Sequence, residues 1–96
     1  MSIMRFKTSL QMLVHEYNVR KQEKWEQDNT TLLDNCKENM LSLAKQGLKT
    51  YEEKYVFNNE ADLRHFVNYW ENESFNVDVT KMDESKKQYV IIRITW

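Results

Sequence analysis

Apolar residues recur at helical spacing near the N-terminus of this chain. The first such stripe has the spacing i, i+3, i+4 and i+7 and consists of Leu10, Leu13, Val14 and Tyr17. Thr8 can cap this helix, because Gln11 stands three residues later and completes a capping box. Beyond Tyr17 the segment becomes mostly polar, with Trp25 near its end. The pattern predicts a helix over about residues 8–26.

A second helical stripe follows and consists of Leu33, Cys36, Met40, Leu43 and Ala44. Gly47 can adopt the left-handed conformation just past its end, with Leu48 as the hydrophobic partner of a Schellman motif. We therefore predict a second helix over about residues 31–46. The polar residues 28–31 favour a break between the two helices. All four are tolerated inside a helix, so one continuous helix over 8–46 is the alternative.

Strand patterns dominate the second half of the chain. Residues 51–57 and 89–96 are rich in apolar and β-branched residues that alternate between two faces. A third strand is indicated where apolar residues alternate with polar ones, at Phe75, Val77 and Val79. The polar stretch at 83–87 predicts the turn between the last two strands.

One more helix is predicted between these strands, with a stripe that consists of Leu63, Phe66, Val67 and Trp70. Asn58 and Asn59 can cap its first turn. The elements then follow in the order ααβαββ, which is an α+β fold. We expect residues 51–96 to form a β-α-β-β unit, with a small three-stranded sheet and helices on one face, and residues 1–96 to form a single domain.

Composition and charge narrow the classes of function. The 96 residues are 41% hydrophobic and include 12 aromatic side chains, as expected of a folded protein. The net charge is −1, so charge alone gives the chain little attraction to nucleic acid or to a membrane surface. The longest hydrophobic run, residues 89–92, is far too short to span a bilayer. Cys36 is the only cysteine and the N-terminus lacks a signal-peptide core, which favours a cytoplasmic location.

Candidate catalytic and metal-binding residues are few. His15, Cys36 and His65 are isolated from one another and belong to no paired metal motif. A single glycine excludes a phosphate-binding loop. The sequence Glu52-Glu53-Lys54 contains the acid-x-Lys element of metal-dependent nucleases, but that site needs another acidic residue on a preceding strand. We therefore expect no enzyme, no cofactor and no metal.

An apolar surplus favours a protein-binding or assembly module. Aromatic residues and Arg anchor protein interfaces, and the candidate partner-binding residues are Tyr17, Arg20, Trp25, Tyr89, Ile91 and Arg93. We expect a homodimer in which a second copy covers Trp25, with Tyr17 and Arg20 beside it. The alternative is that Trp25 folds back onto the second helix near Leu32 or Leu33.

Other functions remain as alternatives to protein binding. A nucleic-acid binder could use Arg20, Lys21 and Lys24 with the ring of Trp25, and a nucleic-acid mimic could use the acidic C-terminal half. A metal-dependent nuclease is less favoured than either. The composition, rich in Lys, Asn and Glu and without Pro, resembles that of small phage-encoded proteins that inhibit or redirect host proteins. That resemblance covers no motif and implies no role for any residue.

Overall fold

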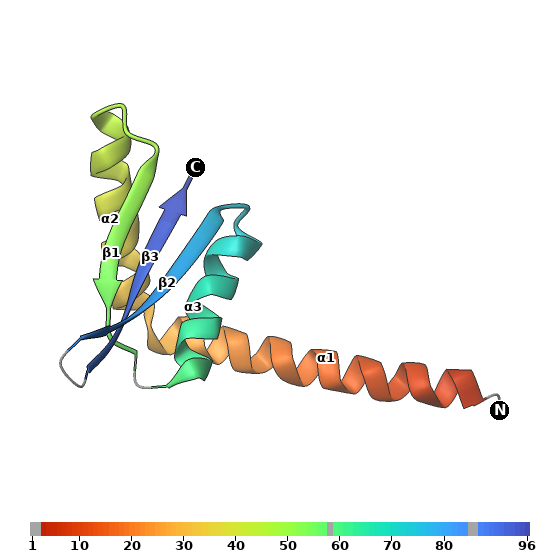
Figure 1. Ribbon diagram of the computed structural model, residues 1–96. Helices are drawn as coiled ribbons and strands as arrows, with labels where there is room; N and C mark the ends of the chain where they lie inside the picture. The colour runs from red at the N-terminus through yellow and green to blue at the C-terminus, as the bar shows by residue number, and fades with distance from the viewer. Residues whose placement is uncertain (1–2, 58, 85–86) are drawn as a thin grey trace.

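Three helices and three strands follow one another in the predicted order ααβαββ (Figure 1). A computed structural model describes residues 3–57, 59–84 and 87–96. Its elements are α1 (Ile3–Asp28), α2 (Thr30–Lys45), β1 (Thr50–Tyr55), α3 (Glu60–Asn72), β2 (Asn76–Glu84) and β3 (Lys87–Thr95). The predicted α+β class is confirmed.

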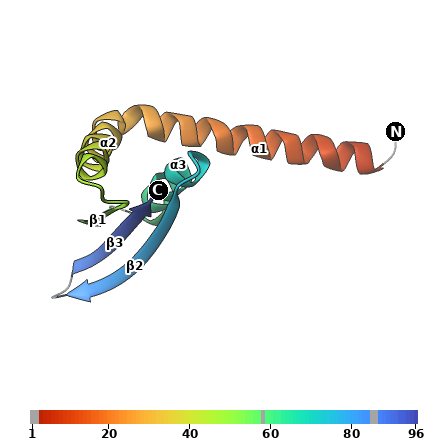
Figure 2. The same cartoon turned by 90° about the horizontal axis from the view of Figure 1, so that it is seen from above.

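The sheet places the last strand in its centre. Its order is β1-β3-β2, and β3 runs antiparallel to both neighbours. Tyr51 pairs with Ile94, which pairs in turn with Val77. Because alternate residues of a strand share one face, the residues of this register face the same side. Helices α2 and α3 cover that side and leave the other face of the sheet open, as predicted (Figures 1 and 2).

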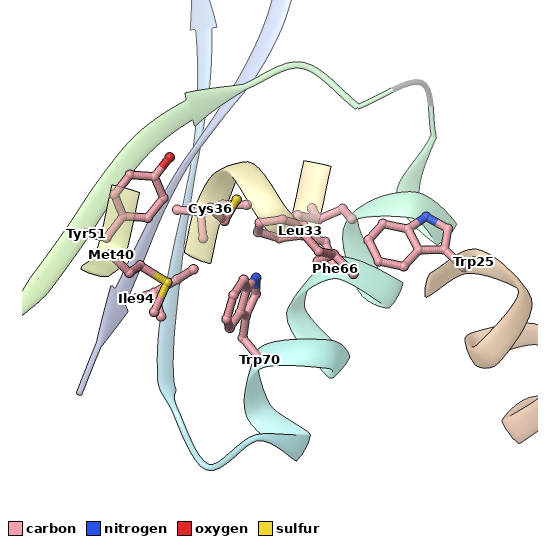
Figure 3. Packing of buried hydrophobic residues seen from close by; sticks show 10 residues of the cluster. Trp25, Leu33, Cys36, Met40, Tyr51, Phe66, Trp70 and Ile94 are labelled. Carbon is pink, nitrogen blue, oxygen red and sulfur yellow. The ribbon is translucent and has the colours of Figure 1, made fainter. Parts of the chain in front are cut away.

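The hydrophobic core lies between the sheet and the helices (Figure 3). Its buried residues come from α1, α2, α3, β1 and β3, and they are Trp25, Leu33, Cys36, Met40, Tyr51, Leu63, Phe66, Trp70, Ile92 and Ile94. Strand β2 contributes the partly buried Val77. The stripes predicted for α2 and α3 supply most of these side chains, so both helices use the face that their sequence indicates.

Helices α2 and α3 both end at a residue in the left-handed conformation. Gly47 has a φ of +80°, and Leu48 N donates to Leu43 O at 3.0 Å, which confirms the Schellman motif. Helix α3 ends in the same way, with Phe75 N donating to Trp70 O at 3.0 Å and a φ of 70° at Ser74. The second motif was not predicted, because serine carries no sequence signal for the left-handed conformation.

The chain breaks between α1 and α2 at a single residue, so the two-helix prediction is right (Figure 2). Asn29 Nδ2 donates to Trp25 O at 2.8 Å, and Thr30 Oγ1 donates to Gln27 O at 2.9 Å. Asn29 and Thr30 belong to the polar residues 28–31 that were predicted to favour this break. Both side chains therefore bind carbonyl groups in the last turn of α1, where the Trp25 carbonyl also accepts from Asn29 N at 3.0 Å.

Some predicted boundaries are corrected. Helix α1 begins at Ile3 rather than at Thr8, because residues 3–7 contain no helix-breaking proline or glycine and continue the helix. The predicted turn at 83–87 lies partly outside the described residues, and the strands extend to 84 and resume at 87. Asn59 caps α3, since its side chain accepts from Asp62 N at 2.9 Å. Asn58 lies outside the described residues.

Candidate functional site

Helix α1 extends far beyond the rest of the fold (Figures 1 and 2). Residues 6–21 are all exposed. The radius of gyration is 17.1 Å, whereas a compact chain of this length would have about 12.5 Å. The N-terminal part of α1 is therefore an arm, and residues 6–21 define it from here on.

The last turns of α1 attach the arm to α3. The Trp25 ring stacks on His65 at 5.9 Å between centroids. It also meets Phe66 edge-on at 6.3 Å (Figure 3). Gln22 Nε2 donates to His65 O at 2.9 Å, and Gln22 Oε1 lies 2.6 Å from His65 Nδ1. Because an amide oxygen can only accept, Nδ1 carries the proton in this pair. The attachment is thus both apolar and hydrogen-bonded.

Five large apolar side chains lie exposed along one side of the arm. Their exposed fractions range from 47% to 63%, and they are Phe6, Leu10, Leu13, Val14 and Tyr17. We call this set the α1 stripe. Contiguous exposed apolar surface of this kind marks interaction sites more often than scattered single residues do.

The sequence pattern identified most of the α1 stripe but predicted the wrong end of the helix as the free end. We expected Leu10, Leu13 and Val14 to face the core and the polar stretch after Tyr17 to lack contacts. The structure shows the reverse, because the Trp25 ring and the Gln22 hydrogen bonds hold the polar end against α3. Phe6 was missed, although it stands four residues before Leu10 and continues the stripe.

The predicted partner-binding residues of α1 fall into two groups. Tyr17 and Arg20 lie exposed on the arm. Trp25 is only 8% exposed and belongs to the core. The expectation that a second copy must cover Trp25 is corrected, since His65 and Phe66 of α3 cover it, and its ring is not free to stack on a base.

Tyr89, Ile91 and Arg93 lie together on the open face of the sheet, as their alternation indicates. Tyr89 and Ile91 are half-buried, and Arg93 is exposed. Arg93 donates to Glu52 Oε2 from Nε at 3.0 Å and from Nη2 at 2.9 Å. Lys54 Nζ lies 4.0 Å from the centre of the Tyr89 ring. This face is largely occupied by its own ion pair and cation–π contact, so it offers less free apolar surface than the α1 stripe.

An apolar groove of about 460 Å³ separates α2 from α3. Its lining consists of Lys37, Met40, Leu41, Ala44, Tyr69, Trp70, Glu73, Phe75 and Trp96. Within this lining, Leu41 and Trp96 are the large apolar side chains that are exposed. The groove therefore exposes fewer large apolar side chains than the α1 stripe does.

The residues weighed for catalysis or metal binding do not converge. Across residues 3–57, 59–84 and 87–96, no group of three or more His, Cys, Asp or Glu side chains could hold a metal ion. In the acid-x-Lys element, Glu52 binds Arg93 and Glu53 accepts from Tyr55 Oη at 3.2 Å. None of the helices in the described part of the chain is both long and apolar enough to cross a membrane.

Cys36 belongs to a small polar network beneath β1. Its Sγ lies 3.1 Å from Tyr55 Oη, which lies 3.2 Å from Tyr51 Oη. Burial raises the pKa of the Cys36 thiol, and the nearby Glu53 carboxylate raises it further, against the effect of the Tyr55 hydrogen bond. Burial likewise raises the pKa of the Tyr55 hydroxyl. Both shifts favour the neutral forms and oppose nucleophilic chemistry here.

These shifts predict a loss of stability at alkaline pH. A thiol whose pKa is higher in the folded chain stays protonated while the unfolded chain ionises, so stability falls as pH rises above about 8.5. We expect the free energy of unfolding to decrease between about pH 7 and pH 9.5 more steeply in the wild type than in Cys36→Ala. Urea titrations at both pH values measure the free energy of unfolding. An equal decrease between the two pH values in both proteins would disprove the role of Cys36.

Comparisons of the chain with protein-family models, curated proteins and solved structures gave no match.

Proposed function

We propose that this protein is a protein-binding module whose binding surface is the α1 stripe. The observation that supports the proposal is the exposure of five large apolar side chains on one side of a helix that extends away from its own core. In globular proteins, most of the stability of a helix comes from packing its apolar face. The arm, which is exposed throughout, gains that stability when another polypeptide covers the α1 stripe.

The energetics favour a reversible complex. Covering a half-exposed side chain of this size contributes roughly 1 kcal/mol. Five such side chains, matched by a similar set on the partner, would contribute roughly 10 kcal/mol. Association costs about 4–15 kcal/mol in lost translational and rotational freedom. The net gain is therefore about 6 kcal/mol at most, so we expect weak, reversible binding with a dissociation constant of about 40 μM or higher rather than a permanent complex.

Site-specific photo-cross-linking in the producing cells tests the proposal whatever the identity of the partner. A photoreactive amino acid replaces Leu13 in one variant and Met12 in the control. These neighbours match well, since Leu13 is 62% exposed and Met12 is 60% exposed. Met12 points roughly 140° away from the centre of the α1 stripe, at 3.6 residues per turn.

We expect an adduct with another polypeptide chain at position 13 and much less at position 12. Whether that chain is a second copy or a different protein, the adduct supports a binding role for the α1 stripe. No adduct at position 13, or equal adducts at both positions, would contradict the proposal.

A further inference from the structure

We infer that the polypeptide that covers the α1 stripe is a second copy of this chain, and that the two α1 helices pair in parallel as a short coiled coil. This inference rests on the proposed function and specifies its partner. Three features of the arm support it: the spacing of its apolar residues, the side of the helix that they occupy, and the charges beside them.

The apolar spacing is that of a coiled-coil seam. Phe6, Leu10, Leu13 and Tyr17 are separated by four, three and four residues. This is the alternating a and d spacing of a heptad repeat, with Leu10 and Tyr17 at a and with Phe6 and Leu13 at d. Such a seam is self-complementary, so a two-fold axis can place the same patch on both copies.

The seam lies on a side of α1 that the rest of the fold leaves open. Trp25 and Gln22 define the side that packs against α3. The seam is rotated from that side by roughly 120° around the helix axis. A second helix can therefore lie along the seam without displacing α3.

Charges beside the seam favour the parallel orientation. Glu16 occupies a g position and Lys21 the following e position, and both are exposed. In a parallel pair each g residue faces the next e residue of the partner helix, so Glu16 meets Lys21 of the other copy twice by symmetry. Lys21 Nζ already lies 4.7 Å from the Tyr17 ring, at the edge of the seam.

An antiparallel pair would lose this match. In an antiparallel pair, g residues lie beside g residues and e residues beside e residues. If Leu10 packs against Leu13 of the partner, Glu16 faces Ser9 and Lys7 faces Val14. None of these pairs joins opposite charges. Arg20, at the next d position, ends the apolar seam in the parallel pair.

Disulfide trapping with purified protein tests both the partner and the orientation. Phe6→Cys and Tyr17→Cys are introduced separately into the wild-type chain, whose own Cys36 is buried and serves as the background. Both positions lie outside the core, so both variants should fold. A parallel pair brings like positions together, and we expect each variant to form a disulfide-linked dimer on its own, with none in the wild type.

Other cross-linking results would overturn the inference. A disulfide that forms only when Phe6→Cys and Tyr17→Cys are mixed would show an antiparallel pair. No disulfide in any sample, together with a monomeric mass for the wild type at hundreds of micromolar, would exclude a second copy as the partner. An adduct with a different protein at position 13 in cells would then show that the proposed function stands and only this inference fails.

Charge reversal gives an independent check on the same inference. Lys21→Glu places like charges together, so we expect the dissociation constant to increase by roughly threefold to tenfold. The double variant Glu16→Lys with Lys21→Glu restores opposite charges and should recover the wild-type value. Equal dissociation constants for all three proteins would show that these two residues do not face each other.

Discussion

Replacing Phe66 by alanine should lower the free energy of unfolding by about 3–5 kcal/mol, the largest effect that we expect from any single substitution. Phe66 is fully buried, and its ring lies 5.2 Å from that of Tyr55, 5.5 Å from Phe57 and 6.3 Å from both Trp25 and Trp70, between centroids. These rings come from α1, from β1 and the segment that follows it, and from α3. The cavity that the alanine leaves would therefore weaken the contacts among all these elements at once.

The size of this effect matters because the domain is small. A chain of 96 residues has a stability of roughly 5–14 kcal/mol, so this loss is a large share of the total. Urea denaturation followed by tryptophan fluorescence measures the loss. Phe66→Leu is the matched control and should cost less than about 1.5 kcal/mol, since it preserves most of the volume. A loss below about 1 kcal/mol in Phe66→Ala would contradict the central position of this ring.

Replacing Trp25 by alanine should cost about 3 kcal/mol or more and should loosen α1 from α3. The ring supplies the buried apolar contact at this junction, and the hydrogen bonds of Gln22 to His65 are only partly buried beside it. Hydrogen exchange should therefore rise around residues 22–28 as well as in the body of the fold.

A second measurement separates this role from a role in the interface. The α1 stripe stays intact in Trp25→Ala, so we expect the variant to dimerise as the wild type does at temperatures where both are folded. Complete loss of dimerisation in a folded Trp25→Ala protein would show that Trp25 contacts the partner after all. Unchanged stability would show that the ring does not hold α1 in place.

Most of the fold follows from short-range signals in the sequence. Gly47 ends α2 because a left-handed residue is needed there, and Asn59 starts α3 because its side chain accepts from a free backbone amide. The alternation of Val90, Ile92 and Ile94 indicates that these three residues share one face of β3, and the structure buries that face. Each of these signals acts within a few residues and can be recognised without the tertiary structure.

The binding surface could be predicted only in part, because helical periodicity shows which side of a helix is apolar but not what covers it. The stripe at Leu10, Leu13 and Val14 has the same spacing as the buried stripe of α3 at Leu63, Phe66, Val67 and Trp70. What distinguishes them is the contact between Trp25 and α3, whose residues lie some 40 positions away in the sequence. That long-range contact determines which end of α1 becomes the arm.

Amide hydrogen exchange of residues 6–21, measured over a series of protein concentrations, tests most directly whether a second copy of the chain covers the α1 stripe. We expect protection to increase with concentration in the wild type, because pairing stabilises an arm that the rest of the chain leaves exposed. Leu13→Glu should abolish this protection, and Met12→Glu should preserve it. Protection that is independent of concentration and equal in all three proteins would contradict the inference that a second copy stabilises the arm.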